Sequence, residues 1–122
     1  MLRLAIIDDE EETRQIMVNF IDWDTYGITV VGEASDGFAA YDLINSLRPD
    51  IVLIDIQMPG MTGLDVLEKI RSEDLISPAF IIMSGYDDFE FARRAVSLAA
   101  VEYLLKPFRP DDVIMKIQKL FP

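Results

Sequence analysis

The sequence predicts an α/β fold in which helices cover both faces of a doubly wound, parallel, five-stranded sheet. Five short apolar runs of strand-forming residues alternate with segments whose apolar residues recur at helical spacing. The run at residues 51–55 lacks the polar alternation of a sheet with one solvated face, which is typical of a parallel strand buried on both sides. Because crossovers between parallel strands are right-handed, we expect the intervening helices on both faces of the sheet.

The expected order is a strand followed by a helix, repeated five times. The expected strands are residues 2–7, 28–34, 51–55, 79–84 and 101–105. Each expected helix carries apolar residues three and four positions apart, as a helix packed on a sheet requires. In chain order these stripes are Ile16, Met17, Phe20 and Ile21; Ala40, Leu43, Ile44 and Leu47; Leu64, Leu67 and Ile70; Ala92, Ala95, Val96 and Ala99; and Val113, Ile117 and Leu120.

Polar residues and a proline mark where several of these helices begin. Asp36 is placed to cap the second helix. Thr62, followed three residues later by Asp65, is a capping-box signature for the third. The acidic pair at 87–88 favours the start of the fourth helix through its dipole, and Pro110 suits the first turn of the fifth.

Composition indicates one domain, residues 1–122, with an ordinary globular balance of 51% hydrophobic and 27% charged residues. The 22 acidic and 11 basic residues give a net charge of −11, which argues against binding nucleic acid or an anionic membrane. Without cysteine there is no disulfide or thiolate metal site. No apolar run approaches the ~20 residues that span a bilayer, so we expect a cytoplasmic protein. The apolar end at Phe121 and Pro122 is consistent with a fragment cut from a longer protein.

Polar side chains follow four of the five expected strands. Asp8 and Asp9 follow the first, Asp55 ends the third, Ser84 ends the fourth and Lys106 follows the fifth. If the first and third strands are neighbours, these groups converge at the switch point on the carboxyl edge of the sheet, where open α/β sheets bind ligands. Three crowded carboxylates repel one another, and Mg²⁺ relieves this by binding carboxylates, a carbonyl and waters. We interpret Asp55 as a nucleophile that accepts a phosphoryl group.

Each of these residues also has a simpler interpretation. An Asp at a strand end can merely turn the chain or cap a helix. The acids of residues 8–12 favour the dipole of the helix that they open, by about 0.3–1 kcal/mol each. That account is weak for the first two, which directly follow a buried strand. Lys106 alone suggests a snorkelling surface lysine, and Ser84 an ordinary turn serine. Their placement at one sheet edge favours the functional interpretation.

Four motifs, in order, carry a resemblance to a known family. The sequence has DDE after the first strand, DIQMPG around the third, SGYDD after the fourth and YLLKPF after the fifth. It resembles, over essentially its whole length, the response-regulator receiver domain of bacterial two-component signalling. The resemblance implies the flavodoxin-like (βα)₅ topology with strand order 2-1-3-4-5. The segments IDWDTYGI and SGYDDFEFARRA further resemble receivers that precede an AraC-type DNA-binding domain, which the 122 residues do not include.

The resemblance implies a role for each residue of the predicted site. Asp55 is the phosphoacceptor, and Lys106 contacts the phosphoryl oxygens. Asp9, Asp55 and the backbone carbonyl of Gln57 ligate Mg²⁺ (or Mn²⁺), while Asp8 acts mainly through a bound water. The phosphoryl donor is a phosphohistidine on a sensor histidine kinase or a small phosphodonor. Such a domain promotes its own phosphorylation and dephosphorylation without being a dedicated turnover enzyme.

The resemblance also implies a switch and an output face. Ser84 stands where the family has its switch hydroxyl, and Tyr103 where it has its switch aromatic. Phosphorylation then changes the face of the fourth helix, fifth strand and fifth helix, to control an effector or homodimer formation. Arg93, Arg94 and Lys116 belong to this face, although a solvated helix surface explains the arginines equally well. One departure is the pair at 99–100, two alanines where many relatives have a glycine that ends the fourth helix.

Three other classes of protein fit less of the sequence. An Asp-nucleophile phosphohydrolase usually has a second acid where this chain has Gln57. A flavin carrier of the same topology needs a hydroxyl-rich phosphate loop, whereas DDEEE repels a phosphate. A phosphorylation-independent interaction module, or pseudo-receiver, would lack one of the key groups, and this sequence has all of them.

Overall fold

The computed structural model describes residues 1–85, 93–94 and 102–122. The fourth expected helix, its acidic start at 87–88 and the alanine pair at 99–100 lie outside the described residues, apart from two helical positions, Arg93 and Arg94.

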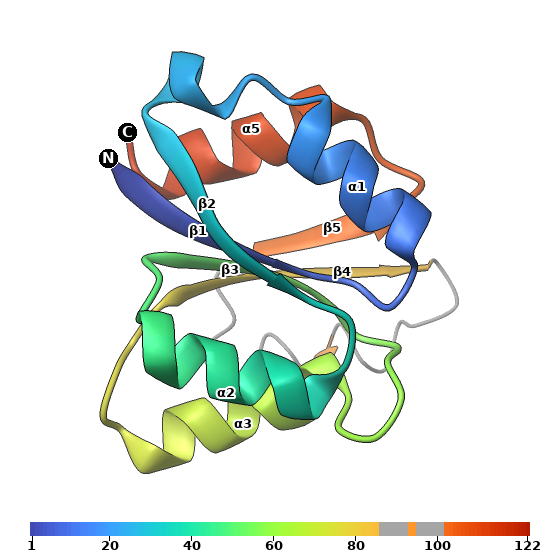
Figure 1. Ribbon diagram of the computed structural model, residues 1–122, viewed down its shortest axis with the longest axis vertical. Helices are drawn as coiled ribbons and strands as arrows, with labels where there is room; N and C mark the ends of the chain where they lie inside the picture. Colours follow the sequence, from blue (N-terminus) through green and yellow to red (C-terminus); the bar gives the residue numbers. More distant parts are fainter. Residues whose placement is uncertain (86–92, 95–101) are drawn as a thin grey trace.

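Five parallel strands form one sheet in the order β2-β1-β3-β4-β5, as predicted (Figure 1). All four neighbouring pairs are parallel. The strands are β1 (Leu2–Ile7), β2 (Ile28–Ala34), β3 (Ile51–Asp55), β4 (Ala79–Gly85) and β5 (Glu102–Lys106). The last two end one residue later than expected, so Lys106 is the final residue of β5 rather than the first residue after it. The peptide between Lys106 and Pro107 is cis.

Helices cover both faces of this sheet. They are α1 (Glu11–Asn19), α2 (Gly37–Leu47), α3 (Gly63–Glu73) and α5 (Pro110–Leu120), with a 3₁₀ helix η1 (Trp23–Tyr26) between α1 and β2. Helices α2 and α3 lie on one face, and α1 and α5 on the other (Figure 1). Within the described ranges, no helix combines the length and apolarity that crossing a bilayer requires.

The central strands are buried on both faces, which explains why they lack polar alternation. All five residues of β3 are buried. Ile54 belongs to the apolar cluster under α2 and α3, while its neighbour Leu53 belongs to the cluster under α1 and α5. The sheet therefore separates two cores and presents only its edges to solvent.

Local capping signals act as the sequence predicts. Asp36 accepts a hydrogen bond from the backbone N–H of Ala39 at 2.8 Å. Thr62 and Asp65 form the complete capping box at the start of α3, with bonds of 3.0 and 3.2 Å. Pro110 is the first residue of α5. These contacts satisfy backbone N–H groups that have no partner within the helix.

The expected stripe of the first helix is wrong at two of its four positions. Phe20 is 77% exposed and Ile16 is 46% exposed. Helix α1 ends before Phe20, so Ile21 reaches the core from the following loop. Trp23 is also buried there, and its indole Nε1 donates to the carbonyl of Met17 at 3.0 Å. This anchor turns the chain away from the helix axis and leaves Phe20 on the surface.

A matched pair of leucine substitutions tests this core. Leu53 is fully buried, whereas Leu75 is 76% exposed. We expect Leu53→Ala to lower the free energy of unfolding by about 2–5 kcal/mol, because it removes apolar burial and leaves a cavity. Leu75→Ala should change it by less than about 0.5 kcal/mol. Urea unfolding of both variants checks this, and equal effects would contradict the assignment of β3 to the core.

Candidate functional site

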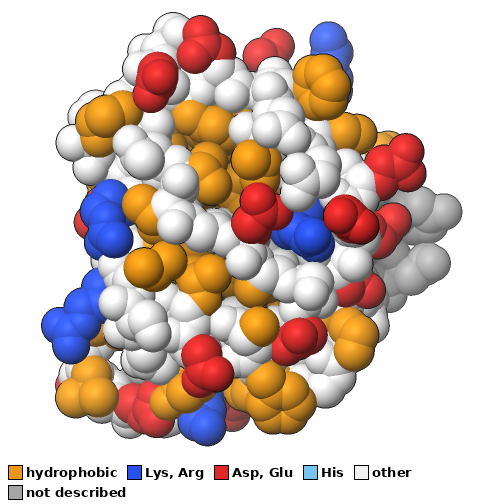
Figure 2. Space-filling model, viewed as in Figure 1, with side chains coloured by type: hydrophobic (Ala, Val, Ile, Leu, Met, Phe, Trp, Pro, Cys, Tyr) orange, Lys and Arg blue, Asp and Glu red, His pale blue; other side chains and the backbone are white. Residues whose placement is uncertain are grey.

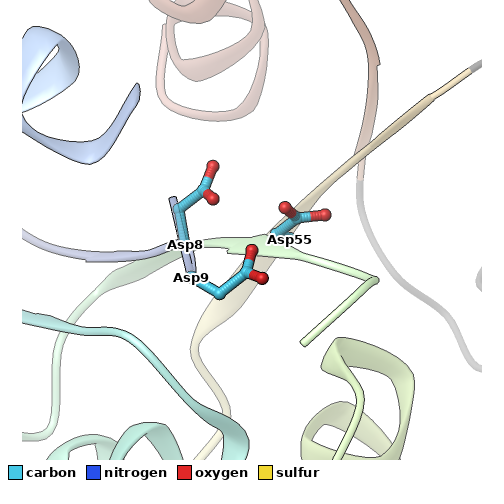
Figure 3. Close-up of side chains that lie close together, drawn as sticks. All are labelled: Asp8, Asp9 and Asp55. Atoms are coloured by element: carbon cyan, nitrogen blue, oxygen red, sulfur yellow. The ribbon is translucent and has the colours of Figure 1, made fainter. Parts of the chain in front are cut away.

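Three carboxylates meet where β1 and β3 end. In the register of these strands Ile7 lies beside Ile54, so the next residues, Asp8 and Asp55, are also neighbours. Asp8 and Asp55 are buried, and Asp9 is exposed. One carboxylate oxygen from each of the three lies within 4.8 Å of the others. The side chain of Asp9 points toward Asp55 (Figure 3).

One ammonium group joins the two buried carboxylates. Lys106 Nζ donates to Asp55 Oδ2 at 2.8 Å and to Asp8 Oδ2 at 3.0 Å. It also lies 3.7 Å from an oxygen of Glu10. Acidic side chains gather around a basic one on the right-hand half of the face in Figure 2, over the carboxyl ends of the strands. The structure therefore brings Asp8, Asp9, Asp55 and Lys106 together, as the strand-end argument predicts.

The surroundings of Asp55 and Lys106 shift the pKa of both side chains. Burial raises the pKa of the Asp55 carboxyl to about 6; the Asp8 charge adds to this, while Lys106 and the backbone N–H of Gln57 act in the opposite direction. Burial alone would lower the pKa of Lys106, but its hydrogen bonds to Asp55 and Asp8, with their charges, outweigh this and raise it. At neutral pH we therefore expect Asp55 ionised and Lys106 charged.

The donor set fits a hard divalent cation. Three carboxylates and one ammonium leave a local charge of −2 when all are ionised. Oxygen ligands of this kind suit Mg²⁺ or Mn²⁺, whereas the soft thiolate and imidazole ligands that favour zinc or copper are absent from the whole sequence. A second positive charge would relieve the repulsion that Lys106 alone does not cancel.

The loop after β3 contacts both the side chain and the backbone of Asp55. The backbone N–H of Gln57 donates to Asp55 Oδ1 at 3.2 Å. The loop then folds back, and the N–H of Gly63 donates to the carbonyl of Ile56 at 2.9 Å. A Cβ atom at Gly63 would lie 2.2 Å from the Asp55 carbonyl oxygen. Only glycine allows this approach, and the sequence reasoning did not identify it.

The two predicted switch residues contact each other. Ser84 is fully buried at the end of β4, and its hydroxyl donates to the carbonyl of Gly85 at 2.9 Å. It also shares a hydrogen bond with the Tyr103 hydroxyl. Tyr103 is half-buried against the apolar cluster under α2 and α3. Within the described part of the chain, Ser84 has no hydrogen bond to Asp55, so the structure joins it to Tyr103 and not to the acids.

Sequence reasoning missed two charged residues that support the acids. Arg14 Nη1 donates to the backbone carbonyl of Asp8 at 2.7 Å, and Arg14 Nε donates to Glu33 at 2.8 Å. The available signal was a lone arginine two residues after the acidic run. Its partner, Glu33, lies on β2, so the contact between the two residues depends on how β2 pairs with β1.

Comparisons with known proteins agree with this geometry. A family model described as the response regulator receiver domain matches residues 4–118. The uncharacterized transcriptional regulatory protein YesN of Bacillus subtilis is 34% identical over 122 residues, which are 98% of this chain and 32% of YesN. The transcriptional regulatory protein HptR of Staphylococcus aureus is 36% identical over 107 residues, 88% of this chain and 41% of HptR. The chain thus spans about a third to two fifths of these relatives.

Solved structures give the same result. The REC domain of AraT, a response regulator from Geobacillus stearothermophilus, is 35% identical with a TM-score of 0.87, over 98% of this chain and 95% of that one. A DNA-binding response regulator of the LuxR family from Staphylococcus aureus is 30% identical with a TM-score of 0.90, over 100% of both chains. Both the fold and the predicted family are therefore confirmed, and the chain belongs to the response regulator receiver domain family.

Proposed function

We propose that this receiver domain of two-component signalling is a phosphorylation-dependent switch in which Asp55 accepts a phosphoryl group in a Mg²⁺-dependent reaction. The observation that carries the proposal is the arrangement around Asp55. One carboxylate oxygen is held by Lys106 Nζ at 2.8 Å, and oxygens of two further carboxylates lie within 4.8 Å of an Asp55 oxygen, close enough for the three to share a cation. A merely structural acid needs none of these neighbours.

Four groups of this chain would hold the metal. Asp9 and Asp55 supply carboxylate oxygens, Gln57 its backbone carbonyl, and Asp8 an oxygen that acts through a water. When bound, Mg²⁺ supplies positive charge for the oxygens of the transferred phosphoryl group. Mn²⁺ has the same preference for oxygen ligands and can replace it.

The chain's own residues hold the nucleophile and receive the new charge. An Asp55 carboxylate oxygen attacks phosphorus, and the bond from phosphorus to the donor nitrogen or oxygen breaks, its electron pair leaving with the donor. The Gln57 N–H and Lys106 hold the two Asp55 oxygens from different sides. Lys106 then turns from the carboxylate to the phosphoryl oxygens and offsets their charge.

The signal follows from the new acceptor oxygens. A phosphoryl group brings about −1.5 to −2 charge and strong hydrogen-bond acceptors. Ser84 can donate to one of them only by giving up its bond to the Gly85 carbonyl, and this changes its contact with Tyr103. Phosphorylation then favours one of two packings of β4 and β5, which is a population shift.

The output face is the fourth helix with β5 and α5. Lys116 on α5 lies 3.6 Å from Glu102 on β5. Arg94 pairs with Glu68 and lies 3.7 Å from Asp65, so it joins its helix to α3. Rearrangement of β5 would alter the Lys116–Glu102 pair and present a different surface to an effector or to a second copy of the domain.

Longer relatives suggest the partners. We propose a sensor histidine kinase as the phosphoryl donor. We further propose that this receiver works with a DNA-binding output domain, because several relatives are transcriptional regulators of more than twice this length. The segments IDWDTYGI and SGYDDFEFARRA, which resemble receivers that precede an AraC-type domain, suggest that type. The receiver itself, at a net charge of −11, is a poor partner for a phosphate backbone.

Replacing the nucleophile tests the reaction. We expect Asp55→Asn to abolish incorporation of labelled phosphoryl groups from acetyl phosphate with Mg²⁺, because the amide is a far weaker nucleophile. Asp42→Asn is the matched control, since Asp42 is an exposed acid on α2. Persistent labelling of the Asp55 variant would assign the nucleophile to another residue.

The same variant tests the electrostatics in the absence of metal. Because the pKa of Asp55 is raised to about 6 from 3.8, the folded state takes up a proton before the unfolded state as pH falls. Asp55 therefore lowers stability as pH rises from about 4 to 7. We expect Asp55→Asn to be more stable than the wild type at pH 7, by roughly 1–3 kcal/mol, and to lose this advantage near pH 4. Urea unfolding with chelator measures it, and a difference independent of pH would contradict the assignment.

Replacing Lys106 separates phosphorylation from signalling. We expect Lys106→Ala to retain some labelling but to lose the response of β5 and α5, because no ammonium couples the phosphoryl group to β5. Amide hydrogen exchange of β5 and α5 before and after phosphorylation reports this. Lys69→Ala, on the exposed face of α3, is the control. A wild-type response in the Lys106 variant would show that another group carries the signal.

A further inference from the structure

We propose that Arg14 is a positioning residue for the metal site. It fixes the peptide that joins Asp8 to Asp9 and so aims the Asp9 carboxylate at Asp55. This inference rests on the proposed function, because it assigns how the metal ligand Asp9 is oriented. Glu33 accepts a hydrogen bond from the Arg14 guanidinium and so holds it in place.

Arg14 makes two directed contacts from a largely buried position. Its side chain is 13% exposed. Nη1 donates to the Asp8 carbonyl at 2.7 Å, and Nε donates to Glu33 Oε1 at 2.8 Å. The same Glu33 oxygen accepts from Gln15 Nε2 at 3.0 Å. Two different donors of one planar guanidinium are therefore used, which fixes its orientation in a way that a single contact would not.

The contacts of Arg14 with Asp8 and Glu33 lie near the junction of β1 and α1. The N–H of Asp8 donates to the carbonyl of Ala34 on β2 at 3.1 Å. Arg14 holds the other end of the same residue, its carbonyl, and Glu33 immediately precedes Ala34 on β2. Both backbone groups of Asp8 are thus tied, directly or through Arg14, to the end of one strand. Helix α1 has no side-chain cap of its own.

Asp8 and Asp9 differ in what orients their side chains. The Asp8 carboxylate accepts from the N–H of Glu10 at 2.9 Å and from Lys106 at 3.0 Å. The Asp9 carboxylate is exposed and has no hydrogen bond to any described residue. Its direction toward Asp55 (Figure 3) therefore depends on the backbone that carries it. The Arg14 contact to the Asp8 carbonyl sets the plane of that peptide.

Charge and geometry predict opposite effects of removing Arg14. A guanidinium near the site repels a cation, so loss of its charge alone would tighten Mg²⁺ binding. Loss of orientation would weaken binding, because Asp9 would have to be ordered when the metal binds. A purely structural link between α1 and β2 would lower stability and leave the affinity for Mg²⁺ unchanged. The sign of the change distinguishes the three explanations.

An NMR titration of ¹⁵N-labelled, metal-free protein with Mg²⁺ tests the inference. We expect Arg14→Gln to weaken Mg²⁺ binding roughly 10-fold, as loss of a group that orients a metal ligand typically does. Glu33→Gln should weaken it less, because one contact of Arg14 remains. Arg3→Gln is the matched control: Arg3 Nη1 donates to the carbonyl of Arg48 at 2.9 Å at the opposite edge of the sheet. Its affinity should stay within twofold of the wild type.

Amide hydrogen exchange gives a second readout without metal. We expect the Asp8 and Glu10 amides, which donate to the Ala34 carbonyl and to the Asp8 carboxylate, to exchange several-fold faster in Arg14→Gln than in the wild type. If that variant does not fold, Arg14→Lys replaces it; a single ammonium cannot make both contacts, so intermediate effects are expected. Unchanged or tighter Mg²⁺ binding by a folded Arg14 variant would overturn the inference. Failure of the wild type to bind Mg²⁺ would instead overturn the proposed function, and with it the role given to Arg14.

Discussion

Two buried carboxylates share one ammonium at the carboxyl edge of the sheet, and this electrostatic imbalance governs the site. Asp8 and Asp55 are almost fully enclosed, yet Lys106 supplies one positive charge for both, and Asp9 adds a third carboxylate. Like charges this close are unfavourable in a protein interior. A domain shaped only for stability would not retain them. Their persistence makes sense if a cation and a transferable anion enter and leave the same place.

The scaffold makes this imbalance tolerable by being rigid around it. Strand β3 is buried along its whole length between two apolar cores, so Asp55 stands on a backbone that cannot relax away from its neighbours. The parallel register places Asp8 beside Asp55, and Gly63 packs closely against the Asp55 backbone carbonyl. The apolar cores therefore support the reactive site, because their packing keeps its side chains in position.

Much of this was predictable from the sequence because strand ends in a parallel sheet share one edge. Asp8, Asp9, Asp55 and Lys106 each stand at or just after the end of a predicted strand, so no knowledge of side-chain packing was needed to bring them together. Contacts between distant side chains were not predictable in the same way. The Arg14–Glu33 pair depends on the register of β2, and the bond between Ser84 and Tyr103 on that of β5. The end of α1 was missed because a buried Trp23 overrides a regular apolar stripe.

The most direct test of the account is to locate the modified residue chemically in the unaltered protein. Treatment with acetyl phosphate, followed by borohydride reduction and peptide mass spectrometry, converts an acyl phosphate into a stable product at its own position. We predict modification at Asp55 alone, dependent on Mg²⁺ and lost when the metal is chelated. Modification at another residue, or the same yield without a divalent cation, would contradict the claim that these acids form a metal-dependent phosphoryl-accepting site.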